Sequence, residues 1–140
     1  MTIETTAHLN YHGQAREALE FYASVFGGQV VAFTHAQVQD SSHPADDELL
    51  AWGEVRTSTG FRVMAYDVRQ DQQYDAGERA FFVSVRGDDA DELTGYWHAL
   101  REGATIEADL GPAPWAPLYG MLRDRFGVTW VLDAPAPYAG

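Results

Sequence analysis

Cysteine and lysine are both absent from this chain of 140 residues. Without cysteine there can be no disulfides, no thiolate nucleophile and no zinc site built on thiolates. Without lysine, a Schiff base on a side-chain amine and a phosphate-binding lysine of the P-loop type are also excluded. All 9 basic residues are therefore arginines, and 21 acidic residues outnumber them.

Long apolar runs and positive charge are scarce as well. No apolar run approaches the roughly 18 residues that a membrane-spanning helix needs, so no membrane partner is expected. Segment 1–5 lacks a basic stretch followed by an apolar one, which predicts a cytoplasmic protein. The formal net charge of −12 argues against binding to nucleic acid. It is compatible with a cationic ligand, although the simpler interpretation is that acidity keeps the protein soluble.

The length suits one compact domain with a core of its own. In the first half, a strand is expected over 7–11 and a helix from about residue 14 to 26, which Gly27 is placed to end. The apolar stripe of that helix consists of Ala15, Ala18, Leu19, Tyr22, Val25 and Phe26. Further strands are expected over 29–39, 49–56 and 61–66, with a polar loop at 40–47 and a turn at 57–60.

The second half repeats this order after a polar segment. A strand is expected over 80–86, then a helix capped by Asp88 or Asp89 and ended by Gly103. The remaining strands are expected over 104–110, 118–123 and 128–133. The chain is thus predicted to hold two βαβββ modules, at about 1–67 and 80–133, with a linker at 68–79 and a tail at 134–140.

Two motifs, one near each end, carry a family resemblance. The first is the helix that opens at Gly13-Gln14-Ala15-Arg16 and stops at Phe26-Gly27-Gly28, and the second is the turn Arg123-Asp124-Arg125-Phe126-Gly127-Val128-Thr129-Trp130. In this order they resemble the vicinal oxygen chelate superfamily of glyoxalases, bleomycin resistance proteins and dioxygenases, and within it the PhnB-like branch labelled after a 3-demethylubiquinone methyltransferase. The resemblance implies an α+β fold with an open, eight-stranded, barrel-like sheet around a cavity, helices outside, and a homodimer.

The resemblance also implies three positions for the ligands of a divalent metal. His8 lies near the first, on the first strand, and the alternative to a ligand is a histidine that lines the cavity. Trp52 stands at the second and Val131 at the third, and neither side chain offers a usable lone pair. We therefore predict no cofactor and no metal. If a metal does bind, His8 and Glu54 are its expected ligands.

The first strand limits what the histidines can do together. Side chains alternate along a strand, so His8, Asn10 and His12 are expected on one face, with Leu9 and Tyr11 towards the helix. Four strand residues span roughly 13 Å. Since a metal–nitrogen bond is only about 2 Å long, His8 and His12 cannot hold one ion.

Aromatic residues are the remaining signal for a ligand site. Trp97 and Trp130 are expected in the core or at a dimer interface. Trp115, on the proline-rich loop 111–117, is a candidate lid over the cavity. The predicted ligand-binding residues are His8, Asn10, His12, Trp52, Glu54, Arg62, Met64, Tyr66, Trp115 and Tyr119.

Three functions are compatible with these patterns. The preferred one is metal-free binding of a small molecule in an aromatic cavity. The alternatives are a metal-dependent lyase, isomerase or dioxygenase with a displaced site that adds His12 or Asp133, and a protein-interaction role with the cavity filled by its own side chains. No Gly-x-Gly-x-x-Gly turn follows a strand, so the methyltransferase label of the branch has no support in the sequence.

Overall fold

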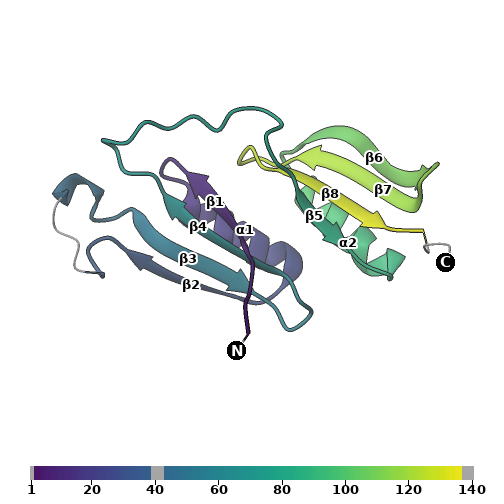
Figure 1. Ribbon diagram of the computed structural model, residues 1–140, viewed down its shortest axis with the longest axis horizontal. Coiled ribbons are helices and arrows are strands. Elements are labelled where there is room, and N and C mark those ends of the chain that lie inside the picture. The colour runs from purple at the N-terminus through teal and green to yellow at the C-terminus, as the bar shows by residue number, and fades with distance from the viewer. Residues whose placement is uncertain (1, 39–42, 137–140) are drawn as a thin grey trace. The chain divides into compact units, whose positions relative to one another are not determined.

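The chain forms two compact units, residues 1–76 and 77–140 (Figure 1). The computed structural model describes residues 2–38 and 43–136. The expected loop at 40–42, the end of the expected strand at 39 and the tail from 137 lie outside this part. Each unit contains one helix and one four-stranded sheet, which confirms the α+β fold of two modules. In the described part, no strand pairing joins the two sheets into a closed barrel.

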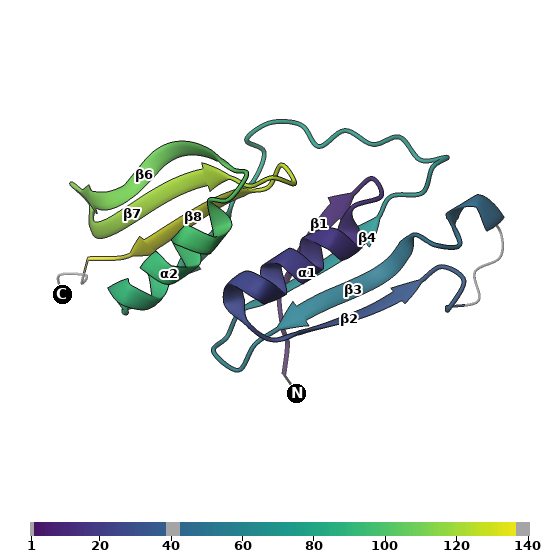
Figure 2. The ribbon, with the colours of Figure 1, turned by 180° about the vertical axis from the view of Figure 1, so that it is seen from behind.

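The first unit places its helix on one face of a mixed sheet. Its sheet order is β1-β4-β3-β2, and only β1 and β4 run parallel. Helix α1 lies across one face of this sheet (Figure 2). The elements are β1 (Ala7–Tyr11), α1 (Ala15–Phe26), β2 (Gln29–Thr34), a 3-10 turn η1 (Pro44–Asp46), β3 (Leu50–Arg56) and β4 (Arg62–Asp67).

The second unit repeats this topology. Its sheet order is β5-β8-β7-β6, again with one parallel pair, β5 and β8. Neither α1, of 12 residues, nor α2, of 11, is long and apolar enough to cross a bilayer. The elements are β5 (Val83–Arg86), α2 (Ala90–Leu100), β6 (Thr105–Ala113), β7 (Ala116–Arg123) and β8 (Thr129–Ala134).

The structure differs from the sequence predictions at element ends. Strand β2 stops at Thr34 because the side chains of Thr34 and Gln37 accept each other's backbone N–H and form a turn. Helix α2 ends at Leu100, three residues before Gly103, the glycine expected to end it. The proline-rich stretch 111–117 is not a long loop, since β6 and β7 extend into it and leave a tight hairpin turn.

A glycine lets each helix approach its sheet closely. A Cβ on Gly53 of β3 would lie 2.5 Å from Leu19 Cδ1 on α1. A Cβ on Gly120 of β7 would lie 2.8 Å from Trp97 Cζ3 on α2. Both distances are shorter than real Cβ contacts, so a side chain at either position would force the packed Leu19 or Trp97 side chain, or the backbone, to shift.

Asp67 connects three elements of the first unit. Its Oδ1 accepts hydrogen bonds from the backbone N–H of Gly13 (3.0 Å) and Ala15 (2.9 Å), and its Oδ2 accepts one from Leu50 N–H (3.0 Å). The side chain of Gln14, at the N-cap of α1, makes no capping bond. The buried Asp67 carboxylate, at the end of β4, therefore caps α1. Its negative charge also interacts favourably with the positive N-terminal end of the helix dipole.

Asp124 explains the C-terminal motif in the second unit. Its Oδ1 accepts from the N–H groups of Phe126 (2.8 Å) and Val128 (3.0 Å), and its Oδ2 accepts from the indole N–H of Trp130 (2.8 Å). Trp130 and Trp97 are both fully buried, as predicted. One buried carboxylate thus closes the turn and satisfies the only polar atom of a core tryptophan.

Replacing Asp67 with Asn should destabilise the first unit. The amide keeps one acceptor oxygen but presents an NH₂ group to a backbone N–H, which leaves a buried donor unsatisfied. The free energy of unfolding should fall by about 2–3 kcal/mol, measured by urea unfolding followed with far-UV circular dichroism. Asp88→Asn, at an exposed position, is the control and should change little. Equal stability of the two variants would contradict the capping role of Asp67.

His35 should make stability fall in mild acid. Burial, and secondarily the Arg69 guanidinium, lower the pKa of His35 below 6.5, although Asp46, Asp67 and Asp47 act in the opposite direction. The unfolded state then binds the proton more readily than the folded state, so stability is present above pH 6.5 and is lost as the pH falls below it. Urea unfolding at several pH values should show a shallower loss for His35→Gln than for the original chain. Parallel curves would contradict this.

Candidate functional site

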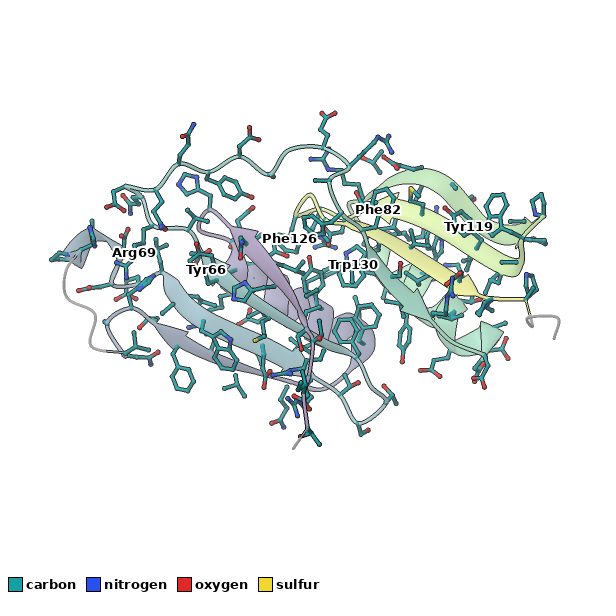
Figure 3. All side chains as sticks on the ribbon, in the orientation of Figure 1. Tyr66, Arg69, Phe82, Tyr119, Phe126 and Trp130 are labelled. Carbon is teal, nitrogen blue, oxygen red and sulfur yellow. The ribbon has the colours of Figure 1, made fainter. Side chains whose placement is uncertain are left out.

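The face of the first sheet opposite α1 is the candidate site. We call it the open face, because helix α1 covers only the other side and several of its apolar side chains remain exposed, Val31 by 46% and Phe33 by 44%. Tyr66 is labelled among its side chains in Figure 3. By strand alternation the open face consists of His8, Asn10, Gln29, Val31, Phe33, Trp52, Glu54, Arg56, Arg62, Met64 and Tyr66.

Strand pairing sets these residues in rows across the sheet. Met64 on β4 is paired with His8 on one side and with Glu54 on the other. One step along, Arg62 lies directly opposite Arg56. The rows therefore place an arginine pair at one end of the open face and aromatic residues further along it.

The aromatic part of the open face is built by side-chain contacts between strands. The indole N–H of Trp52 donates to Met64 Sδ at 3.0 Å. The rings of Phe33 and Trp52 are nearly parallel, at 15°, with centroids 6.2 Å apart. The His8 and Tyr66 rings meet edge to face at 5.5 Å. These rings form a partly exposed apolar floor on which a planar ligand can stack.

The charged part of the open face includes a residue from outside the sheet. Arg62 donates from Nε to Glu54 Oε2 (2.9 Å) and from Nη1 to Glu4 Oε2 (2.6 Å). Arg56 donates from Nη2 to the same Glu4 oxygen (3.1 Å). Glu4 comes from the segment that precedes β1. The two arginines are thus bridged by one carboxylate oxygen.

His8 and Asn10 form a local pair on β1. His8 Nδ1 lies 2.8 Å from Asn10 Oδ1. With the amide oxygen as acceptor, Nδ1 carries the proton and Nε2 keeps the lone pair. Both side chains are exposed. The pair can offer a ligand one acceptor nitrogen beside the aromatic floor.

His12 follows the end of β1 instead of lying on it. Strand β1 ends at Tyr11, so strand alternation does not by itself place His12 on the face of His8 and Asn10, where it was expected. Its ring lies 5.5 Å from the ring of Tyr74, whose hydroxyl donates to the Asn10 carbonyl (3.3 Å). Leu9 and Tyr11 are buried, as predicted.

Trp115 and Tyr119 belong to the second unit. Trp115 lies in the turn between β6 and β7, is 62% exposed, and meets the Tyr119 ring edge to face at 5.1 Å. Asp133 receives two hydrogen bonds from Arg86, at 3.2 and 3.0 Å. Figure 3 labels Tyr119 and Trp130 in this unit.

The donors on the open face do not fit the superfamily's metal. Trp52, at an expected ligand position, donates a proton instead of offering a lone pair. The Glu54 carboxylate is paired with the Arg62 guanidinium, whose positive charge opposes a cation at that oxygen. Within residues 2–38 and 43–136, no three His, Asp or Glu side chains are grouped as metal ligands.

Some residues of the open face are not among the site residues predicted from the sequence. Val31 and Phe33 alternate within a predicted strand, so their shared face could have been read from the pattern, but its pairing with β3 could not. Arg56 likewise falls within a predicted strand, but it is not among the predicted ligand-binding residues. No sequence pattern indicated a role for Glu4, because its segment shows no helical or strand periodicity.

Comparison with known proteins places the chain in a family. The sequence profile of the family described as 3-demethylubiquinone-9 3-methyltransferase matches residues 3–132. The chain belongs to this family. This is the PhnB-like branch of the vicinal oxygen chelate fold, as the two sequence motifs predicted. No curated protein matches the chain.

Solved structures agree with this family and fold. Protein PA1353 from Pseudomonas aeruginosa has a TM-score of 0.82 and 29% identity, covering 96% of this chain and 98% of its own. A PhnB protein from Bacillus cereus has a TM-score of 0.71 and 23% identity, with coverage of 94% and 99%. A glyoxylase/bleomycin resistance protein/dioxygenase domain from Frankia sp. EAN1pec has a TM-score of 0.68 and 10% identity, with coverage of 97% and 99%. At these identities, the last two show the fold alone.

Proposed function

We propose that this chain binds a small aromatic molecule on the open face of its first sheet, without a metal at the superfamily's usual positions. The observation that carries the proposal is the row of contacts between Phe33, Trp52 and Met64. These side chains form an apolar floor beside charged groups, which is the composition typical of ligand sites. Exposed apolar side chains that form a contiguous patch with polar residues at its rim are typical of binding surfaces.

The fold supports the proposal only in general terms. The name of the Frankia domain covers glyoxylases, bleomycin resistance proteins and dioxygenases. The family's own description names a methyltransferase. However, the sequence has no glycine-rich turn after a predicted strand, which a Rossmann-type site for a methyl donor would need. We extend the proposal to a homodimer, as the resemblance implies. We also propose a cytoplasmic location and no resident cofactor, as the sequence predicts.

Aromatic probes should bind in a way that depends on Trp52. Benzyl alcohol, indole and naphthol, each titrated by calorimetry, should include at least one binder, because stacking on the floor replaces its contact with water. Trp52→Ala should weaken that binding at least tenfold, a loss of about 1.4 kcal/mol. Phe81→Ala removes an aromatic ring that is 57% exposed and lies outside the open face, and it should leave binding unchanged. Equal loss in both variants would contradict the site.

Divalent metals should not stabilise the protein. Thermal melts with and without Ni²⁺, Zn²⁺, Mn²⁺ or Fe²⁺ should coincide, because Trp52 and the Arg62-paired Glu54 are poor donors. Elemental analysis of the purified protein should find no stoichiometric metal. A metal-dependent rise in melting temperature that is lost in His8→Ala would contradict this proposal and favour a lyase, isomerase or dioxygenase.

A further inference from the structure

We propose that Arg56 and Arg62 form a subsite for the carboxylate of the ligand, and that Glu4 is its internal occupant when no ligand is bound. The ligand class is then an aromatic carboxylate, with its ring on Trp52 and Met64 and its anion between the two arginines. This inference rests on the proposed function, since it names the chemistry of the molecule that binds on the open face.

The arginine pair is an unusual arrangement for this chain. Only 9 basic residues are present against 21 acidic ones, yet two of the arginines lie directly opposite each other on β3 and β4. Like charges at directly opposed strand positions repel and destabilise the sheet. An anion between them removes that repulsion, and in this structure the anion is the Glu4 carboxylate.

Glu4 occupies this position with an incomplete set of contacts. Both arginines bond to the same oxygen, Oε2, at 3.1 and 2.6 Å. A ligand carboxylate that offers both of its oxygens to the two guanidinium groups can form more charge-assisted hydrogen bonds than the single oxygen of Glu4 does. Glu4 is also 59% exposed and comes from segment 2–6, which is neither helix nor strand. Exposed ion pairs of this kind contribute little to stability, so a ligand can displace Glu4.

Glu54 holds the subsite in position. Its side chain is only 16% exposed and accepts from Arg62 Nε, which fixes the orientation of a guanidinium that is 24% exposed. Arg62 and Met64 are two residues apart on β4, a separation of about 6.6 Å. The two positions are neighbours on the open face, so an aromatic acid with a short linker can hold its carboxylate at the arginines and its ring over the Trp52–Met64 contact.

Removing the internal occupant should strengthen carboxylate binding. Phenylacetate, benzyl alcohol and benzylamine carry the same ring with a negative, neutral or positive group, and each is titrated by calorimetry. Phenylacetate should bind more tightly than benzyl alcohol, and benzylamine least. Glu4→Gln should raise the affinity for phenylacetate several-fold and leave that for benzyl alcohol unchanged. Glu20→Gln, an exposed acid on α1, removes the same charge elsewhere and should not change the preference.

Removing the arginines should abolish the preference for the acid. Arg56→Gln and Arg62→Gln should each bind phenylacetate and benzyl alcohol equally. Arg56 is 51% exposed and does not pair with Glu54, so Arg56→Gln should keep the fold even where loss of Arg62 disturbs it. Arg16→Gln on α1 is the matched control and should retain the preference.

The possible outcomes separate this inference from the proposed function. If benzyl alcohol binds through Trp52 but phenylacetate binds no better and Glu4→Gln has no effect, the carboxylate subsite is wrong while the aromatic site stands. If no aromatic probe binds, both are wrong. If inorganic phosphate, titrated in the same way, gains affinity in Glu4→Gln and phenylacetate does not, the carboxylate class is wrong.

Discussion

The buried Asp67 carboxylate is the interaction on which the first unit depends. It accepts hydrogen bonds from the backbone at the start of α1 and at the start of β3, and it ends β4 itself. Its contacts fix the helix against one face of the sheet. The β4 residues that alternate with those facing the helix therefore lie on the other face. Arg62, Met64 and Tyr66 can form a site because Val63, Ala65 and Asp67 form the core.

The two units pack a helix on a sheet in the same way, but different polar groups cap their helices. Gly53 and Gly120 occupy the corresponding third strand of each unit and let the helix rest directly on the sheet. Helix α1 is capped from β4, whereas α2 is capped by its own Asp89, which accepts from the N–H groups of Asp91 and Glu92. The two units therefore share their apolar periodicity and the placement of one glycine, whereas the residues that cap their helices differ.

Local patterns in the sequence predicted most of this fold. The stripe of α1, the alternation of Leu9 with His8 on β1 and the turn motif at Asp124 each depend on residues close in sequence, so each could be read directly. Strand ends were less predictable, because β2 stops where Thr34 and Gln37 bond to each other. Glu4 could not be placed at all, since its partners are 52 and 58 residues away.

The net charge of the chain is compatible with a cationic ligand, but the local charges at the open face favour an anionic one. The acids at the end of the open face, Glu4 and Glu54, are matched by Arg56 and Arg62, so this part of the face carries no net charge despite the −12 of the chain. Nearby charges are screened less there than distant ones, which are largely screened beyond roughly 8 Å at physiological salt. If a ligand displaces Glu4, the face loses one negative charge and the two arginines outnumber Glu54. Displacement therefore favours an anion, because only an anion restores the neutrality that Glu4 supplied.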